Sequence, residues 1–210
     1  MIMNARTSGS WLQDDRVEAA AERILDAAAA LFVERGVATT GMAEVAKAAG
    51  CSRATLYRYF ENRRALHRAF VHREARRLGE RIAAALAPVT DPRERVTEAV
   101  IMAVREVRST PTLAAWFGLG DAGVASELAS TSEVIEVLGI SFLSDERGRD
   151  NRSADRRNSD VRFREDADIA GRARWLVRAI VSLLTVPGAD VDDERAMVEQ
   201  FVVPVVLPTW

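Results

Sequence analysis

The sequence predicts an all-α fold, for three reasons. Only 12 glycines and 6 prolines occur among 210 residues, and long stretches are rich in alanine, the strongest helix former. Apolar residues recur at intervals of three and four along much of the chain, which is the period of an amphipathic helix. No run of alternating β-branched residues indicates a strand. Because 48% of the residues are hydrophobic and 29% charged, one or two folded domains are expected rather than disorder.

The first predicted helix runs from Arg16 to Arg35. Its apolar residues fall on one face, and Gly36 follows at the position of a C-terminal cap. Residues 1–15 lack such a period and predict a flexible N-terminal arm. The residues that define the apolar face are Ile24, Leu25, Ala28, Leu31 and Phe32.

Two short helices follow, separated by a tight turn. Gly41 and Glu44 have the spacing of a capping box, which predicts a helix over residues 42–49 that ends at Gly50. Ser52 can accept a hydrogen bond from a backbone N–H two or three residues ahead, so another helix begins almost at once. Two helices joined by so short a turn form a helix-turn-helix.

The rest of the chain is predicted to be helical, with one exception. A long helix begins at Arg63 after the cap residue Asn62 and reaches Leu86, before Pro88 stops it. Residues 145–168 hold eight acids and seven arginines but only four apolar residues, so they predict a mobile loop. The other predicted helices span residues 93–108, 111–117, 131–142, 169–186 and 194–206.

The last two predicted helices are apolar on more than one side. A helix with two apolar faces must be buried on both. One face can pack against its own domain and the other against an identical subunit, so the sequence predicts a twofold dimer joined by an intersubunit four-helix bundle. The residues expected at this interface are Leu176, Ile180, Leu183, Leu184, Val198, Phe201, Val202 and Val205.

Positive charge is concentrated in one segment. The whole chain carries a net charge of −2, which by itself argues against binding to nucleic acid. Between Cys51 and Arg81, however, nine arginines accompany only three acids, an excess of six positive charges. Docking on nucleic acid requires a local basic face of this kind.

Both tyrosines of the chain lie inside this basic segment, on the second helix of the helix-turn-helix. Leu56 and Phe60 are four residues apart and take the inward face together with Cys51. Tyr57 and Tyr59 are therefore expected to point outward rather than into the core.

Arginine, threonine and tyrosine on the outer face are residue types that contact DNA. Arg53 carries the fork that matches O6 and N7 of guanine in the major groove. Thr55 can offer its methyl group to thymine or its hydroxyl to a phosphate, and tyrosine hydroxyls commonly reach phosphates. For each residue taken singly, an ordinary solvated surface position is the alternative.

A resemblance to a known family rests on residues 23–66, which read RILDAAAALFVERGVATTGMAEVAKAAGCSRATLYRYFENRRAL. This stretch resembles the N-terminal DNA-binding region of the TetR family of transcriptional regulators. The resemblance implies a three-helix DNA-binding domain over residues 16–62, joined by a long helix to a helical ligand-binding and dimerisation domain over residues 63–210. It also implies a bacterial repressor that binds a palindromic operator in double-stranded DNA as a homodimer and releases it when a small-molecule effector binds.

The resemblance also implies which residues meet DNA. Arg53, Thr55 and Tyr57 would lie near the bases, while Tyr59 and the first residue of the long helix would hold phosphates. Gly41 stands where the family usually has serine or threonine, so only the N–H groups of that helix remain for a phosphate. The full set is Thr40, Ser52, Arg53, Ala54, Thr55, Tyr57, Arg58, Tyr59 and Arg63.

A pocket between the later helices would bind the effector, because sites between bundled helices are common. The large side chains there favour a mainly apolar molecule, with Arg105 as its polar anchor if that side chain points inward. Plain core packing is the alternative for each of them. The candidates are Met102, Arg105, Trp116, Phe117, Phe142 and Trp175.

Other motifs carry no chemistry. GLGDAG at residues 118–123 matches the glycine pattern of dinucleotide-binding loops, but helical sequence surrounds it where a strand is required. His67 and His72 lie about 140° apart around a helix and do not share a face for a metal ion. No catalytic group, metal site or cofactor is predicted, and the single cysteine, Cys51, is expected to pack as a small apolar residue.

The cellular location and the class of function complete the expectations. A lone cysteine, no secretory pattern and an apolar stretch too short to cross a membrane predict a cytoplasmic protein without a membrane partner. The same helices could instead form a small-molecule carrier or an enzyme whose helix-turn-helix is only scaffold. Sequence-specific, salt-dependent binding to DNA separates these alternatives.

Overall fold

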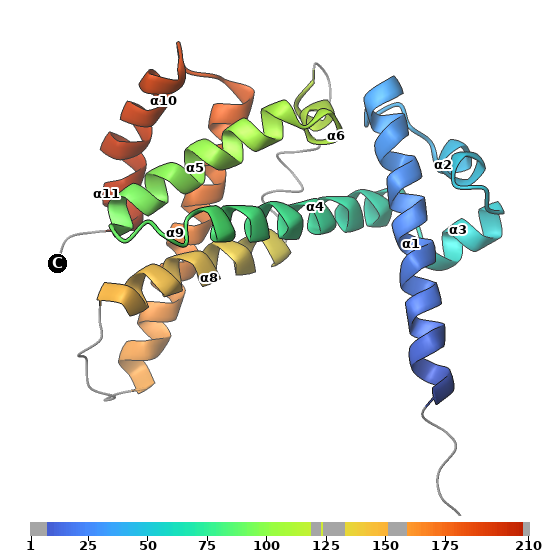
Figure 1. Ribbon diagram of the computed structural model, residues 1–210, viewed down its shortest axis with the longest axis horizontal. Helices are drawn as coiled ribbons and strands as arrows, with labels where there is room; N and C mark the ends of the chain where they lie inside the picture. The colour runs from blue at the N-terminus through green and yellow to red at the C-terminus, as the bar shows by residue number, and fades with distance from the viewer. Residues whose placement is uncertain (1–7, 119–122, 124–132, 151–158, 208–210) are drawn as a thin grey trace, which may run out of the picture. The chain divides into compact units, whose positions relative to one another are not determined.

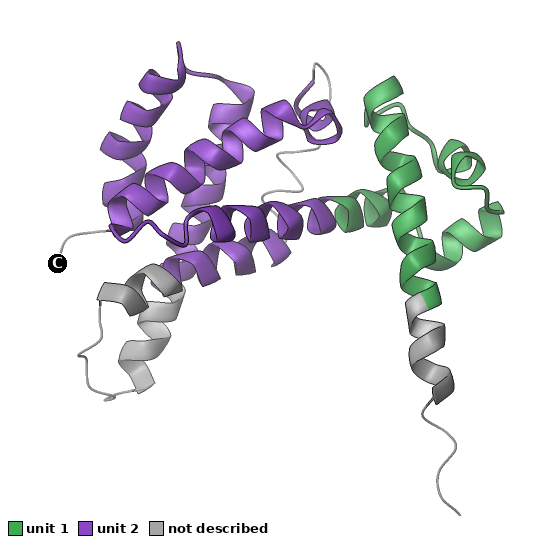
Figure 2. Cartoon of the chain, in the orientation of Figure 1, with its two compact units in different colours: residues 1–70 green, residues 71–210 purple. Residues whose placement is uncertain are grey.

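The computed structural model describes residues 8–118, 123, 133–150 and 159–207, and among them no strand occurs (Figure 1). The all-α prediction is confirmed. None of the described helices is long and apolar enough to cross a membrane. The chain divides into two compact units, residues 1–70 and 71–210 (Figure 2). The helices are α1 (Ser8–Arg35), α2 (Met42–Ala48), α3 (Arg53–Tyr59), α4 (Arg63–Ala85), α5 (Pro92–Ser109), α6 (Pro111–Ala114), η1 (Ala115–Phe117), α8 (Glu133–Asp150), α9 (Ser159–Thr185), α10 (Val191–Met197), η2 (Val198–Val202) and α11 (Val203–Val206).

The first unit packs α1, α2, α3 and the start of α4 around an aromatic centre. Phe32 is 1% exposed, and its ring centroid lies 5.4 Å from those of both Phe70 and His67 in edge-to-face geometry. Such edge contacts add to the gain from burying the rings. Val45 of α2 and Leu56 of α3 are fully buried in the same unit. The apolar spacing read from the sequence therefore places these helices correctly.

α1 begins at Ser8, not at Arg16. Residues 8–15 of the expected flexible arm are thus helical, and residues 1–7 lie outside the described residues. Extending an existing helix fixes one residue for each new hydrogen bond, so it needs no hydrophobic period of its own. Gly36 ends the helix with a φ of 87°, and Gly50 ends α2 with a φ of 64°, as predicted for C-terminal caps.

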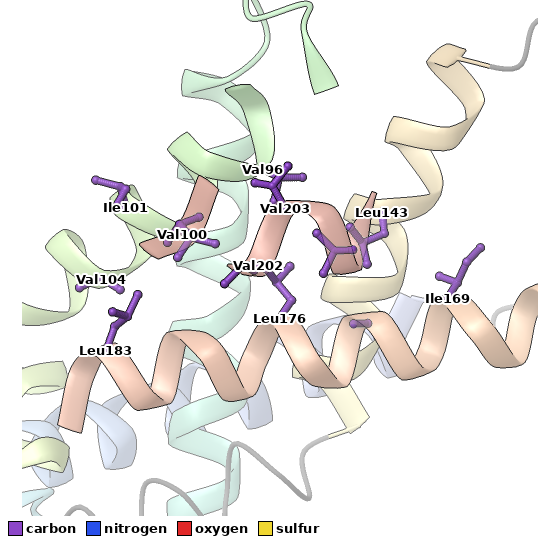
Figure 3. Close-up of a cluster of buried hydrophobic side chains, with 13 residues drawn as sticks. Val96, Val100, Ile101, Val104, Leu143, Ile169, Leu176, Leu183, Val202 and Val203 are labelled. Carbon is purple, nitrogen blue, oxygen red and sulfur yellow. The ribbon is translucent and has the colours of Figure 1, made fainter. Parts of the chain in front are cut away.

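The second unit has a core made by α5, α8, α9 and the C-terminal helices. Figure 3 shows valines of α5 and of the C-terminal segment above the leucines of α9. α8 crosses α9 closely, because a Cβ on Gly139 would lie 3.1 Å from the Cβ of Ala173. The core residues are Val96, Val100, Ile101, Val104, Leu143, Ile169, Ala173, Leu176, Leu183, Val198, Val202, Val203 and Val206.

The loop predicted for residues 145–168 is wrong at both ends. α8 continues to Asp150 and α9 begins at Ser159, so only residues 151–158 lie outside the described residues. Asp168 and Arg172 form an ion pair with the i, i+4 spacing that supports a helix. The charged residues on either side of residues 151–158 are therefore helical, contrary to the prediction from composition. Residues 119–122 of the GLGDAG stretch also lie outside the described residues.

The last predicted helix, residues 194–206, is interrupted. A π-helical turn, η2, separates α10 from α11, and the N–H of Val203 donates to the carbonyl of Val198, five residues back. Pro204 explains the irregularity, because proline lacks the N–H that an α-helix requires and its ring crowds the preceding turn.

An ion pair with a buried carboxylate fastens the C-terminal helices to α5. Arg108 donates to both carboxylate oxygens of Glu194, at 2.9 and 2.7 Å, and to the carbonyl of Leu183 at 2.7 Å. The N–H of Gly188 also donates to Glu194, at 3.1 Å. Arg108 and Glu194 together thus join the end of α5, the end of α9 and α10.

Candidate nucleic-acid interface

α3 has an anchored apolar side and an exposed polar side. Ser52 caps it: the Oγ atom accepts the N–H of Thr55 at 3.0 Å, as the sequence predicts. Leu56 is fully buried and Phe60 is 7% exposed, so these two residues fix which side of α3 faces the core. The exposed residues are Arg53, Ala54, Tyr57 and Arg58.

The two tyrosines of α3 have different surroundings. Tyr57 is 46% exposed and projects into solvent. Tyr59 is half-buried, with its ring centroid 6.5 Å from that of Phe60 and 5.5 Å from the guanidinium carbon of Arg58. Both rings lie outside the core, but of the two only Tyr57 is exposed. Their separate DNA contacts remain predictions.

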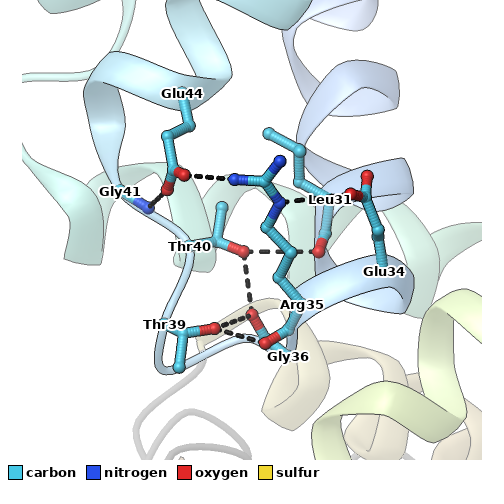
Figure 4. Close-up of polar contacts among 8 residues, drawn as sticks. All are labelled: Leu31, Glu34, Arg35, Gly36, Thr39, Thr40, Gly41 and Glu44. Atoms are coloured by element: carbon cyan, nitrogen blue, oxygen red, sulfur yellow. Dashed lines mark hydrogen bonds and ion pairs between the residues drawn. The ribbon is translucent and has the colours of Figure 1, made fainter.

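The N-terminus of α2 is closed by Glu44 (Figure 4). Its carboxylate accepts the N–H of Gly41 at 2.9 Å and pairs with the guanidinium of Arg35 on α1. The hydrogen bond from Gly41 lowers the pKa of Glu44, and Arg35 lowers it further. The N–H of Gly41 is therefore already paired with this carboxylate, and a phosphate contact of the other N–H groups of α2 stays a prediction.

The side chain of Thr40 is buried and hydrogen-bonded within the first unit. It is 1% exposed, and its hydroxyl donates to the carbonyl of Gly36 at 2.8 Å (Figure 4). The neighbouring Thr39 donates to the carbonyls of Arg35 and Gly36. Both hydroxyls satisfy carbonyls left unpaired at the end of α1. The hydroxyl of Thr40 therefore holds the loop between α1 and α2, and a contact of this residue with DNA stays a prediction.

Arg63 links two segments that are distant in sequence. Its Nη1 atom donates to the carbonyl of Ala38 at 2.8 Å, although the side chain is exposed. Asn62 caps the same end of α4 by accepting the N–H of Ala65 at 2.8 Å, as predicted. Arg63 thus stabilises the loop before α2. The spacing of residues in the sequence does not predict this contact.

The arginines of the basic segment fall into two groups. Those of the first unit are all exposed on α3 and α4, with one acid, Glu61, among them. Beyond residue 70, Arg77 pairs with Glu74, and Arg81 pairs with Glu106. Of the six excess positive charges between Cys51 and Arg81, four therefore belong to the first unit, on α3 and the start of α4. The exposed arginines there are Arg53, Arg58, Arg63, Arg64 and Arg68.

The effector candidates do not all face inward. Trp116 is 3% exposed, and Met102, Phe117 and Phe142 are half-buried in the second unit. Arg105, however, is exposed, and Trp175 is 44% exposed. Arg105 cannot be the inward anchor, because its neighbours on α5 turn their apolar face to the core and leave it on the opposite side. Among the described residues, no group of three or more His, Cys, Asp or Glu could hold a metal ion.

The residues expected at a dimer interface also divide into buried and exposed ones. Leu176, Leu183, Val198 and Val202 belong to the core of the chain itself, and Ile180 and Leu184 pack against that core. Phe201 is 59% exposed and Val205 is 49% exposed. Met197, four residues before Phe201, is 42% exposed on the same side and was not among the expected residues. These three side chains form an exposed apolar stripe.

Comparison with known proteins identifies relatives of the whole chain. The family described as bacterial regulatory proteins, tetR family, matches residues 24–70. An uncharacterized HTH-type transcriptional regulator of Mycobacterium tuberculosis is 48% identical over 198 residues, which cover 94% of this chain and 91% of that one. The HTH-type transcriptional activator FasR of Mycolicibacterium smegmatis is 37% identical over 78 residues, 37% of this chain and 36% of its own length.

Solved structures share the fold. The TetR family repressor AlkX of Dietzia has a TM-score of 0.62 at 20% identity, over 88% of this chain and 93% of that one. Thermus thermophilus FadR in complex with lauroyl-CoA has a TM-score of 0.60 at 23% identity, over 90% of this chain and 96% of that one. RolR in complex with resorcinol has a TM-score of 0.62 at 19% identity, over 93% of this chain and 97% of that one.

Proposed function

The chain belongs to the TetR family of bacterial regulatory proteins, and on that premise we propose that it is a ligand-responsive repressor of transcription. It binds a palindromic operator as a homodimer in the cytoplasm and leaves it when a small, mainly apolar effector binds. The observation that carries the proposal is α3, a helix held by a buried leucine and presenting two arginines and a tyrosine to solvent within a basic surface. A helix of this kind suits the major groove.

Within this proposal the residues of α3 divide between bases and backbone. Arg53 lies in the first turn, where recognition helices contact base edges, and its guanidinium can bind guanine through two hydrogen bonds. Thr55 and Tyr57 lie near it. Tyr59, Arg58 and Arg63 contact phosphates, which fixes the position of α3 on the duplex without reading sequence.

A second copy of the chain covers the exposed apolar stripe. Met197, Phe201 and Val205 recur at intervals of four, and each is more than 40% exposed in the single chain, so a partner would bury apolar surface there. Trp175 on α9, also exposed, gives the neighbouring helix a large apolar side chain for the same purpose. Leu176 and Leu183 support this interface from within the core rather than crossing it.

The effector binds within the second unit, near Trp116, Met102, Phe117 and Phe142. Two regulators that share the fold were solved with a bound small molecule, lauroyl-CoA and resorcinol. Aromatic and aliphatic side chains favour a mainly apolar ligand. A ligand that binds the DNA-free form about 2.7 kcal/mol more tightly than the DNA-bound form lowers operator affinity about a hundredfold.

Fluorescence anisotropy with labelled duplexes from the region upstream of the coding sequence tests the function. A repressor should prefer one duplex over a scrambled duplex of the same composition, and its affinity should fall steeply with salt. Equal binding to both, without salt dependence, would favour a carrier or an enzyme. Because the partial relative FasR is an activator, transcription in vitro from the bound promoter decides between repression and activation.

A further inference from the structure

Arg95 is a charged side chain in the interior of the second unit. It lies in the first turn of α5 and is 4% exposed. Its Nη1 atom donates to the backbone carbonyls of Leu86 and Val89, the latter at 3.2 Å. Its guanidinium carbon lies 6.0 Å from the ring centroid of Phe142 on α8. Arg95 therefore connects α5 with the end of α4 and with α8.

The acceptors of Arg95 stand where α4 ends. The carbonyls at the carboxyl end of a helix lack partners within the helix and carry partial negative charge, so a cation there is favourable. Leu86, whose carbonyl also accepts the N–H of Val89 at 3.1 Å, is 2% exposed. Moving a guanidinium out of water is unfavourable unless its donors are satisfied. Arg95 and the end of α4 thus satisfy each other inside the core.

Another contact of α4 with α5 is weaker. Arg81 and Glu106 pair at 3.5 Å, but the side chains are 49% and 31% exposed. Ion pairs so open to water contribute little. The contact that Arg95 makes is buried, and it holds the backbone rather than a flexible side chain.

We propose that Arg95 is a positioning residue for DNA binding, a role that rests on the dimeric repressor proposed above. α4 begins at Arg63, just after the recognition helix, and leads to the carbonyls that Arg95 holds. Fixing this end limits how far α4 can tilt against the core of the second unit. In a dimer, that limits the separation of the two recognition helices.

The test uses operators with altered half-site spacing. An operator is first selected from random duplexes by the wild-type protein, and one base pair is then inserted at its centre. Wild type and the control Arg93→Met, which changes an exposed arginine in the same turn, should lose about tenfold or more in affinity, because the half-sites no longer match. Arg95→Met keeps an unbranched apolar side chain but removes the donors. It should lose less than about threefold on the same insertion.

The outcomes separate this role from the proposed function. If wild type and Arg95→Met lose affinity by the same factor on insertion, Arg95 does not position α4. If wild type prefers no duplex, the proposed repressor fails, and the role of Arg95 fails with it. Should Arg95→Met not fold by circular dichroism, Arg95→Lys replaces it. Lysine keeps the positive charge but not the forked guanidinium. The loss of operator affinity of Arg95→Lys on insertion should therefore lie between those of wild type and Arg95→Met. A loss equal to that of wild type would also overturn the role.

Discussion

Replacing Glu194 by glutamine tests the half-buried ion pair that joins α5 to the C-terminal helices. Glu194 is 3% exposed and receives two hydrogen bonds from Arg108 and one from Gly188. Glutamine keeps the shape and one acceptor oxygen. It loses the charge and turns an NH₂ group toward the guanidinium donors, so the paired arrangement breaks.

The expected cost follows from burial. Removing one partner of a fully buried ion pair costs about 3–5 kcal/mol. The side chain of Arg108, however, is 36% exposed, so water can solvate it when its partner is lost. Since glutamine also retains one acceptor, Glu194→Gln should lower the free energy of unfolding by about 2 kcal/mol at neutral pH.

The effect should depend on pH. The hydrogen bonds from Arg108 lower the pKa of Glu194 below its ordinary value of 4.5, against the opposing effect of burial. Between the folded and unfolded pKa values the unfolded chain binds more protons, so stability rises with pH. The contribution of Glu194 is complete above the unfolded value and is lost as pH falls through the folded one. The difference in free energy of unfolding between wild type and Glu194→Gln should therefore shrink as pH falls through this range.

Urea unfolding followed by tryptophan fluorescence measures this gap. Glu199→Gln is the matched control. Glu199 is 57% exposed and pairs with Arg195 at 3.9 Å, a long distance for an ion pair, so this substitution should lower the free energy of unfolding by less than about 0.5 kcal/mol. If Glu194→Gln behaves like this control at pH 7, the pair does not stabilise the fold. A gap of the same size at about pH 3.5 would show that the effect does not come from the carboxylate charge.

Four further substitutions have defined outcomes. Arg53→Ala should weaken operator binding by about 1–3 kcal/mol and relax the sequence preference, whereas Arg63→Ala should weaken all sequences alike; anisotropy on operator variants distinguishes them. Phe201→Glu places a charge on the exposed apolar stripe and should leave the protein at its monomer mass of 23.1 kDa in light scattering, while wild type has twice that mass. Gly139→Val should lower the free energy of unfolding by about 1–3 kcal/mol, because its Cβ would meet that of Ala173 at 3.1 Å.

The first unit could be predicted from the sequence because local signals determine it. Ser52 and Asn62 cap α3 and α4, and each cap acts on an N–H three residues away. Gly36 and Gly50 end helices in the left-handed region, where other residues are strained. The inward positions of α3 follow from a spacing of four. Each of these inferences needs only neighbours in sequence.

The parts that sequence reasoning missed depend on contacts between distant residues. Thr40 looks like a polar residue before a helix, and only the fold shows that its hydroxyl bonds the end of α1. Arg63 contacts a carbonyl 25 residues away. The charged segment at 145–168 was expected to be a loop because composition reports missing apolar surface but not ion pairs along a helix, such as Asp168 with Arg172.

Arg95 and Arg105, both on α5, show which sequence signal marks an interior cation. Ala99 and Ala103 follow Arg95 at intervals of four, and all three are buried, so this spacing places Arg95 on the buried face of α5. Arg105 lies off this stripe and is exposed. An arginine that starts a small-residue stripe in the first turn of a helix is also close to the carbonyls that end the preceding helix. By that criterion, loss of charge at Arg95 should alter DNA binding, whereas the same loss at Arg105 should not.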